Sequence, residues 1–131
     1  NIDAYTPVDN VAELTARTND DGWDSVFITW LKTFRLNHKD KILIFSVGGG
    51  NQKKKVSTNL IHAIKYAKKC KSNILCVVGK KNGYSYKNSN VSIHLPVNDI
   101  NKITPISEAF QSVVWHLLVS HPLLQKNKTK W

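Results

Sequence analysis

The sequence lacks methionine altogether and contains only two cysteines, Cys70 and Cys76, in 131 residues. Two cysteines with five residues between them do not by themselves make a metal site, so we expect two free thiols. Free thiols are typical of a reducing compartment and predict a cytoplasmic protein. No apolar run approaches the roughly 18 residues that a membrane helix needs, which argues against a membrane partner.

Arginine is nearly absent as well. Only Arg17 and Arg35 occur, so the formal net charge of +10 comes almost entirely from lysine. Proteins that read nucleic acid usually need arginine for bidentate contacts, and this shortage argues against a nucleic-acid partner. A surplus of lysine, asparagine and isoleucine can also reflect the base composition of a genome. A solvated basic surface is therefore the main interpretation, and attraction of small phosphorylated ligands is the alternative.

Hydrophobic spacing predicts alternating helices and strands within one domain. The expected elements are a short strand near 2–8, a helix over 23–34, a strand over 41–47, a helix over 56–69, a strand over 73–79, an edge strand over 91–97 and a helix over 104–120. The strands at 41–47 and 73–79 are continuous apolar runs, which are typical of a parallel sheet covered on both faces. We therefore expect an α/β fold.

A glycine-rich stretch, ILIFSVGGGNQKKK, ends the first of these apolar strands. Glycines allow successive backbone N–H groups to point into one concavity, where they can hold a phosphate, and a helix beginning near Val56 would add its dipole. The alternative is a tight strand-to-helix turn with no ligand, and the tripeptide Gly48–Gly50 does not decide between them. The stretch is neither a Walker A loop nor a GxGxxG motif.

Several ordered segments, from about residue 18 to residue 124, resemble the sugar isomerase (SIS) domain, and most of all the phosphoheptose isomerases. They are TNDDGWDSVFITWLK, DKILIFSVGGGN, NLIHAIKYAK, NILCVVGKKNGYS, VSIHLPV and TPISEAFQSVVWHLLVSHPLL. The resemblance implies a flavodoxin-like parallel sheet with helices on both faces. It also implies phosphosugar binding, assembly as dimers or tetramers, and a site built between subunits.

The resemblance also implies roles for individual residues. Substrate-binding positions of the family match Asn19, Asp20, Ser46, Val47, Gly48, Gly49, Gly50 and Asn51. Glu108 and His116 match positions that take part in catalysis and in binding a divalent metal such as zinc. The phosphate loop of the family is usually rich in serine and threonine hydroxyls, whereas this one keeps Ser46 and is otherwise mostly glycine.

Helix geometry limits what Glu108 and His116 can do together. Residues eight apart lie about 80° from one another around a helix, on a similar face. They are also about 12 Å apart along its axis, so one metal reaches both only if the helix bends or another subunit intervenes. Without the resemblance, His116 reads as a core or interface histidine beside Trp115, and Glu108 as a carboxylate that complements a helix dipole.

The family pattern has elements that this sequence does not contain, namely its first helices, its first strand and a first phosphate loop. We therefore expect residues 1–131 to form a single partial SIS domain, either through processing or as the remainder of a longer reading frame. In the implied strand order 2-1-3-4-5 the missing strand is central. An unpaired strand edge and exposed apolar surface should then lie beside strand 41–47, and folding should require a second copy or a rearranged edge.

The function expected from this resemblance is phosphosugar binding, in a parent enzyme that interconverts aldose and ketose phosphates. A base would remove the proton next to the carbonyl, and an acid would return it to the neighbouring carbon, with His116 as one proton carrier. The present chain alone should be inactive. The alternative function is a non-catalytic phosphosugar-sensing domain of a regulator, which needs the phosphate loop and no acid or base.

Overall fold

The computed structural model describes residues 2–128. Its elements are α1 (Val11–Asp21), η1 (Trp23–Ser25), α2 (Val26–Thr33), β1 (Lys41–Ser46), α3 (Thr58–Lys69), β2 (Asn73–Val78), α4 (Tyr84–Asn88), β3 (Val91–His94), η2 (Ile100–Lys102) and α5 (Ile103–Ser120). No helix among these residues is both long enough and apolar enough to cross a membrane.

The three strands form one parallel sheet in the order β1-β2-β3. The register aligns Ile44 of β1 with Cys76 of β2, and Val77 of β2 with Ile93 of β3. A parallel sheet flanked by helices confirms the predicted α/β class. The edge position predicted for the strand at 91–97 is also confirmed, because β3 pairs only with β2 among the described strands, although β3 ends at His94, before Pro96.

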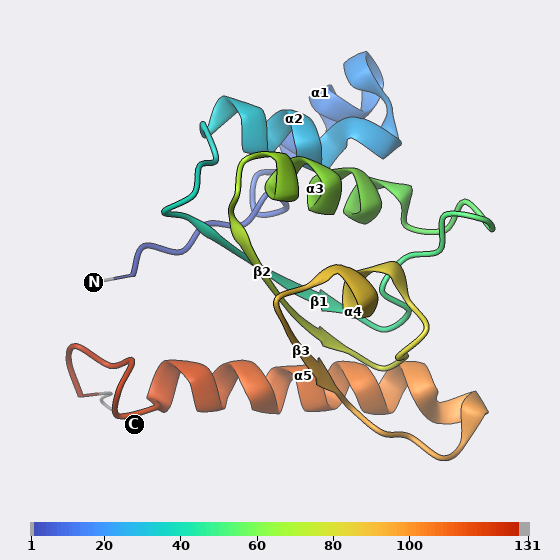
Figure 1. Ribbon diagram of the computed structural model, residues 1–131, viewed down its shortest axis with the longest axis vertical. Helices are drawn as coiled ribbons and strands as arrows, with labels where there is room; N and C mark the ends of the chain where they lie inside the picture. Colours follow the sequence, from blue (N-terminus) through green and yellow to red (C-terminus); the bar gives the residue numbers. More distant parts are fainter. Residues whose placement is uncertain (1, 129–131) are drawn as a thin grey trace.

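The two faces of the sheet are covered differently, as Figure 1 shows. Helices α2 and α3 pack on one face, with α1 outside them and α4 on the same side, whereas α5 alone runs along the other. The buried core lies on the first face, where Ile44, Ile74 and Val78 meet Ile64 and Ala67 of α3. Trp30 and Leu31 of α2 extend this core around Ala63 on the outer side of α3.

Three details of the sequence prediction were wrong. Residues 2–8 form no strand, and α1 was not foreseen because its sequence is mostly polar and buries no residue. It begins where the Asn10 side chain accepts a hydrogen bond from the Glu13 N–H (3.1 Å), a local cap that compensates for the weak hydrophobic pattern. The last helix begins at Ile103 and its N-cap is Lys102, whereas the predicted helix began at Thr104, a residue type that favours the N-cap position.

Strand β1 is not buried on both faces, contrary to the prediction from its continuous apolar run. Leu43 and Phe45 are exposed on the face that α5 leaves open, while Ile44 is buried on the other. Within residues 2–128 no strand pairs with the outer edge of β1. The expected unpaired edge and exposed apolar surface are therefore both confirmed.

Candidate functional site

The glycine loop leaves the carboxyl end of β1 and turns toward α3. The carbonyl of Gly49 accepts hydrogen bonds from the N–H (2.8 Å) and the hydroxyl (2.9 Å) of Ser85, and the Gly50 carbonyl accepts one from the Tyr84 N–H (2.9 Å). Both donors lie at the start of α4. Because the C=O and N–H of one trans peptide point in opposite directions, the Gly50 N–H is directed away from Ser85.

The loop amides divide into two groups. The Gly49 N–H donates to the Ser46 hydroxyl (3.0 Å), and the Asn51 N–H donates to the Val56 carbonyl (2.8 Å). The N–H groups of Gly48 and Gly50 have no acceptor among residues 2–128. Gly50 is nevertheless buried, and an unpaired buried N–H is uncommon. Within residues 48–51, these two amides are therefore the backbone donors without a protein acceptor.

Glycine is required at two points near this loop. Gly50 has a φ of +82°, and a Cβ there would lie 3.1 Å from the Ile61 side chain. A Cβ on Gly83 would lie 2.2 Å from the Gly48 carbonyl oxygen, so the Asn82–Gly83 turn packs directly on the loop. The sequence reading did not assign Gly83 or Ser85 to the site. An Asn-Gly pair such as Asn82–Gly83 is typical of a turn, but it does not show which segment the turn contacts.

The lysines that follow the glycines lie in a separate turn, over residues 52–55. Asn51 and Val56 exchange two backbone hydrogen bonds (2.8 and 3.0 Å), which closes a turn over residues 52–55. The Asn51 side-chain oxygen also accepts from the Lys54 N–H (3.0 Å). The backbone N–H and the side-chain oxygen of Asn51 are therefore both engaged in hydrogen bonds within this turn. Residues 53–55 contribute positive charge near the start of α3, while their side chains are exposed to solvent.

Asn19 and Asp20 lie at the end of α1, in the helical layer outside α3. Both are exposed, and their contact is with each other, from the Asn19 amide to the Asp20 carboxylate (3.0 Å). The neighbouring turn does approach the start of α3, since Asp24 hydrogen-bonds to Thr58 through its carboxylate and to His62 through its carbonyl (2.9 Å). The substrate-binding role of Asn19 and Asp20 stays a prediction.

Glu108 and His116 are both exposed on α5. The His116 ring stacks on Trp115, with ring centroids 4.0 Å apart and planes 25° apart. Helix α5 starts near the carboxyl ends of the strands and runs back along the sheet, so its second half lies away from the glycine loop (Figure 1). Their catalytic role also stays a prediction, and one chain does not bring His116 together with the loop.

These two residues do not fit a shared metal within one chain. They are separated by about 12 Å along a regular helix, which exceeds the span of two ligands on one ion. Among residues 2–128, no group of three or more histidine, cysteine or carboxylate side chains has a geometry that could hold a metal ion.

Comparison with known proteins identifies the fold. No protein-family model and no curated protein matches the chain. A solved structure of a phosphoheptose isomerase from Francisella tularensis is similar over 85% of this chain, with a TM-score of 0.65 and 19% identity. A phosphoheptose isomerase from Neisseria gonorrhoeae is similar over 87%, with a TM-score of 0.64 and 20% identity. The chain has the phosphoheptose isomerase fold.

The chain spans 56% and 59% of the lengths of these two phosphoheptose isomerases. At 19–20% identity the likeness establishes the fold and no more. Within the phosphoheptose isomerase fold, the glycine loop occupies the carboxyl end of a parallel strand, which is where open α/β sheets bind ligands. What this arrangement can do chemically is hold an anion with backbone donors.

Two surface cavities lie elsewhere. One of about 520 Å³ is lined by residues of the N-terminal segment, the start of α1 and the end of α2. The other, of about 380 Å³, is lined by Lys68, Lys71, Ser72, Asn73, Lys87, Asn88, Ser89 and Asn90. No residue from 46–51 lines either cavity. The glycine loop therefore contributes to neither of these two cavities.

Proposed function

We propose that this chain is a phosphosugar-binding domain from an aldose–ketose isomerase of the phosphoheptose isomerase type. The observation that carries the proposal is the pair of free N–H groups at Gly48 and Gly50, at the carboxyl end of β1. Backbone N–H donors without a protein acceptor suit a phosphate oxygen. The lysines at 53–55 add a positive field that attracts an anionic sugar ester.

The test removes one of the two backbone donors. Gly48→Pro deletes the N–H, whereas Gly48→Ala keeps it and places its Cβ in open space, so alanine is the matched control. We expect calorimetry with inorganic phosphate and a ketose phosphate to show binding weakened roughly tenfold or more by proline, and unchanged by alanine. Absence of binding by the unaltered chain, or equal binding by both variants, would contradict the proposal.

The catalytic part of the proposal assigns proton transfer to His116 and a supporting role to Glu108. Because one chain does not bring His116 to the loop, we expect no turnover from the isolated 131-residue chain. In an assembly that does turn over, His116→Ala should reduce the rate by about 10²–10⁴-fold, as is typical for loss of a general acid or base, while phosphosugar binding persists. Turnover by the isolated chain would contradict this assignment.

The second candidate is a phosphosugar sensor without catalysis. The observation that favours it is that Glu108 and His116 are exposed and face no common group within the chain. If the chain is a sensor, we expect phosphosugar binding at the glycine loop and no turnover in any assembly. His116→Ala should then leave phosphosugar binding unchanged. Comparison of turnover and binding in the same variant therefore separates the two candidates.

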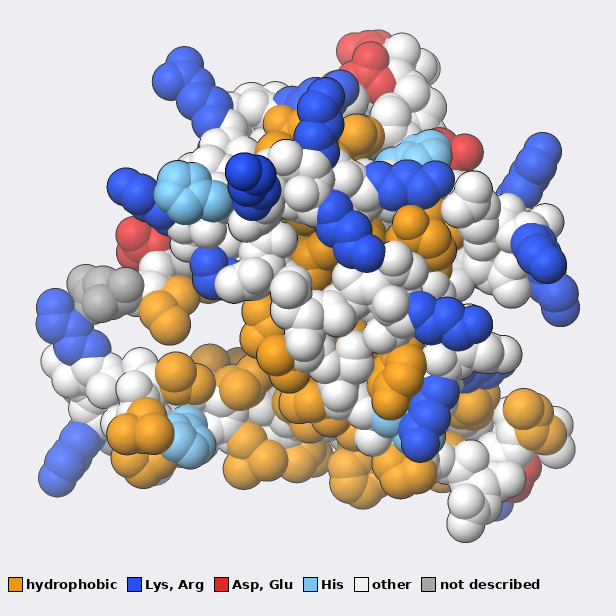
Figure 2. Space-filling view, in the orientation of Figure 1, with side chains coloured by type: hydrophobic (Ala, Val, Ile, Leu, Met, Phe, Trp, Pro, Cys, Tyr) orange, Lys and Arg blue, Asp and Glu red, His pale blue; other side chains and the backbone are white. Residues whose placement is uncertain are grey.

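Self-association is part of the proposal, because a site built between subunits needs it. Figure 2 shows hydrophobic side chains gathered over α5 and beneath the sheet. The exposed members of this open face, as we name it, are Leu43, Phe45, Val91, Ile93, Phe110, Val113, Trp115, Leu117 and Val119. Contiguous apolar surface of this kind marks an interaction site. A second copy would also be the source of any additional ligands for a divalent metal such as zinc.

A further inference from the structure

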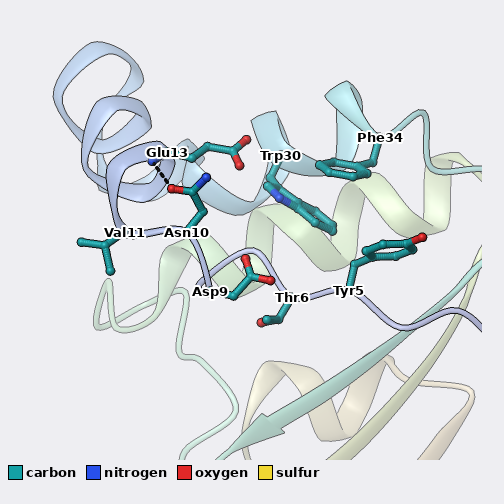
Figure 3. A pocket seen from close by; sticks show the side chains of 8 residues that line it. All are labelled: Tyr5, Thr6, Asp9, Asn10, Val11, Glu13, Trp30 and Phe34. Atoms are coloured by element: carbon teal, nitrogen blue, oxygen red, sulfur yellow. Dashed lines mark hydrogen bonds between the residues drawn. The ribbon is translucent and has the colours of Figure 1, made fainter.

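The larger of the two cavities described above is formed where the N-terminal segment and the start of α1 lie against α2. It has a volume of about 520 Å³, within the range of small-molecule sites. Its lining residues, shown as sticks in Figure 3, are Tyr5, Thr6, Asp9, Asn10, Val11, Glu13, Trp30 and Phe34. None of these residues belongs to the glycine loop or to α5, so the cavity is separate from the candidate phosphosugar site.

One side of this cavity is aromatic. The rings of Trp30 and Phe34 stack with centroids 4.1 Å apart, and Tyr5 lies against Phe34 at 6.1 Å (Figure 3). Trp30 is fixed in the core, whereas Phe34 and Tyr5 are exposed. Aromatic faces that remain accessible attract cations through the negative potential of the ring.

The other side is acidic and has one free carboxylate. Glu13 accepts hydrogen bonds from the Arg17 guanidinium (2.6 and 3.0 Å), and the Asn10 oxygen accepts from the Glu13 N–H (3.1 Å). Asp9 has no hydrogen-bond or ion-pair partner within residues 2–128. The cavity therefore presents a single unpaired negative charge opposite its aromatic wall.

The charge of the surrounding segment has the same sign. Residues 1–24 hold six of the nine acidic residues of the chain and one basic residue, Arg17. The rest of the chain is strongly basic, so the field near this cavity opposes that of the molecule as a whole. A phosphorylated ligand is disfavoured here, and a cation is favoured.

We propose that this cavity binds the quaternary ammonium group of a small organic cation. A primary ammonium or a guanidinium is recognised mainly through several hydrogen-bond acceptors, and here the Asn10 side-chain oxygen and Oε1 of Glu13 are already engaged. A quaternary ammonium needs none, because it binds through aromatic faces and one counter-charge. The inference is independent of phosphosugar binding, because the two sites share no residue and have opposite charge.

The first test compares three probes on the full chain by calorimetry or ligand-observed NMR. They are choline, its uncharged carbon analogue with a tert-butyl group in place of trimethylammonium, and ethanolamine. We expect saturable binding of choline, at least about threefold tighter than either of the other two. A peptide containing trimethyl-lysine, run alongside, distinguishes a side-chain source of the same group from a free cation. No saturable choline binding, or equal binding of the tert-butyl analogue or ethanolamine, would overturn the proposal.

The second test uses matched variants. Asp9→Asn and Phe34→Leu remove the carboxylate and one aromatic face, and we expect each to weaken choline binding about twofold to fivefold. Asp3→Asn and Phe110→Leu make the same changes outside the cavity and should have no effect. Trp30 is left intact because it belongs to the core. If Phe34→Leu lowers the melting temperature, only the choline affinities of Asp9→Asn and Asp3→Asn are compared. Equal affinities of these two variants would refute the assignment.

Discussion

The two faces of the central sheet have similar sequences and very different surroundings. On the α3 face, Ile44, Ile74, Cys76 and Val78 are 0–6% exposed. On the open face, Leu43 and Phe45 of β1 and Val91 and Ile93 of β3 are 38–54% exposed. Both faces of the sheet thus carry apolar side chains, but only the α3 face is fully covered by other parts of the chain.

Helix α5 is the reason that the second face is incomplete. Ser107 is its one buried residue, and Gln111 reaches the sheet through a hydrogen bond from its side-chain amide to the Val77 carbonyl (3.1 Å). Phe110, Trp115 and Leu117 lie on either side of this contact row and remain exposed. A helix that is apolar over most of its circumference is typical of one buried on more than one side. Something further is therefore expected to cover α5 and the open face.

The largest expected effect is on the α3 face. Ile64→Ala removes a fully buried side chain from the closed core and should lower the free energy of unfolding by about 2–5 kcal/mol. Phe45→Ala, on the open face, removes a larger but exposed side chain and should cost less than about 1 kcal/mol in the dilute chain. Urea denaturation of both variants measures the difference. Equal losses would show that the open face is closed in solution.

A second prediction concerns what covers the open face. If a second copy does so, Leu43→Lys with Phe45→Lys should weaken self-association about a hundredfold, or about 2.7 kcal/mol, because two charges would be buried without partners. Ile100→Lys places the same charge on an exposed apolar residue away from the sheet and serves as the control. Sedimentation velocity over a dilution series measures the effect. Unchanged association of the double variant would exclude this face as the interface.

The contrast between the faces also explains how far the sequence could predict the fold. Continuous apolar runs at 41–47 and 73–79 indicated a parallel sheet, and the resemblance indicated which fold; both are confirmed. The same runs led to the wrong expectation of a fully buried β1. Hydrophobicity shows that a side chain can be buried, but it does not show which part of an assembly buries it.

The candidate site was predictable in position but not in detail. The strand-end location of the glycine loop follows from the α/β pattern, and the structure has it there. Which amides are free does not follow, because it depends on tertiary partners such as Ser85, 36 residues away from Gly49 along the chain. The pairing of Asn51 with Val56 could not be predicted from the sequence for a similar reason. The turn over residues 52–55 is closed by backbone hydrogen bonds, which do not depend on residue type.

The smallest predicted effect tests how well α5 fits the sheet. Ser107 and Ser85 are both fully buried, but the Ser107 hydroxyl has no partner within the described residues, whereas the Ser85 hydroxyl donates to the Gly49 carbonyl. Removing an unsatisfied buried hydroxyl should stabilise, and removing a satisfied one should destabilise. Ser107→Ala should therefore raise the free energy of unfolding by about 1 kcal/mol, and Ser85→Ala should lower it by about the same amount, in matched urea titrations. A loss of stability in both variants would mean that the Ser107 hydroxyl finds a partner in solution, and that α5 sits closer to the sheet than its exposed side chains indicate.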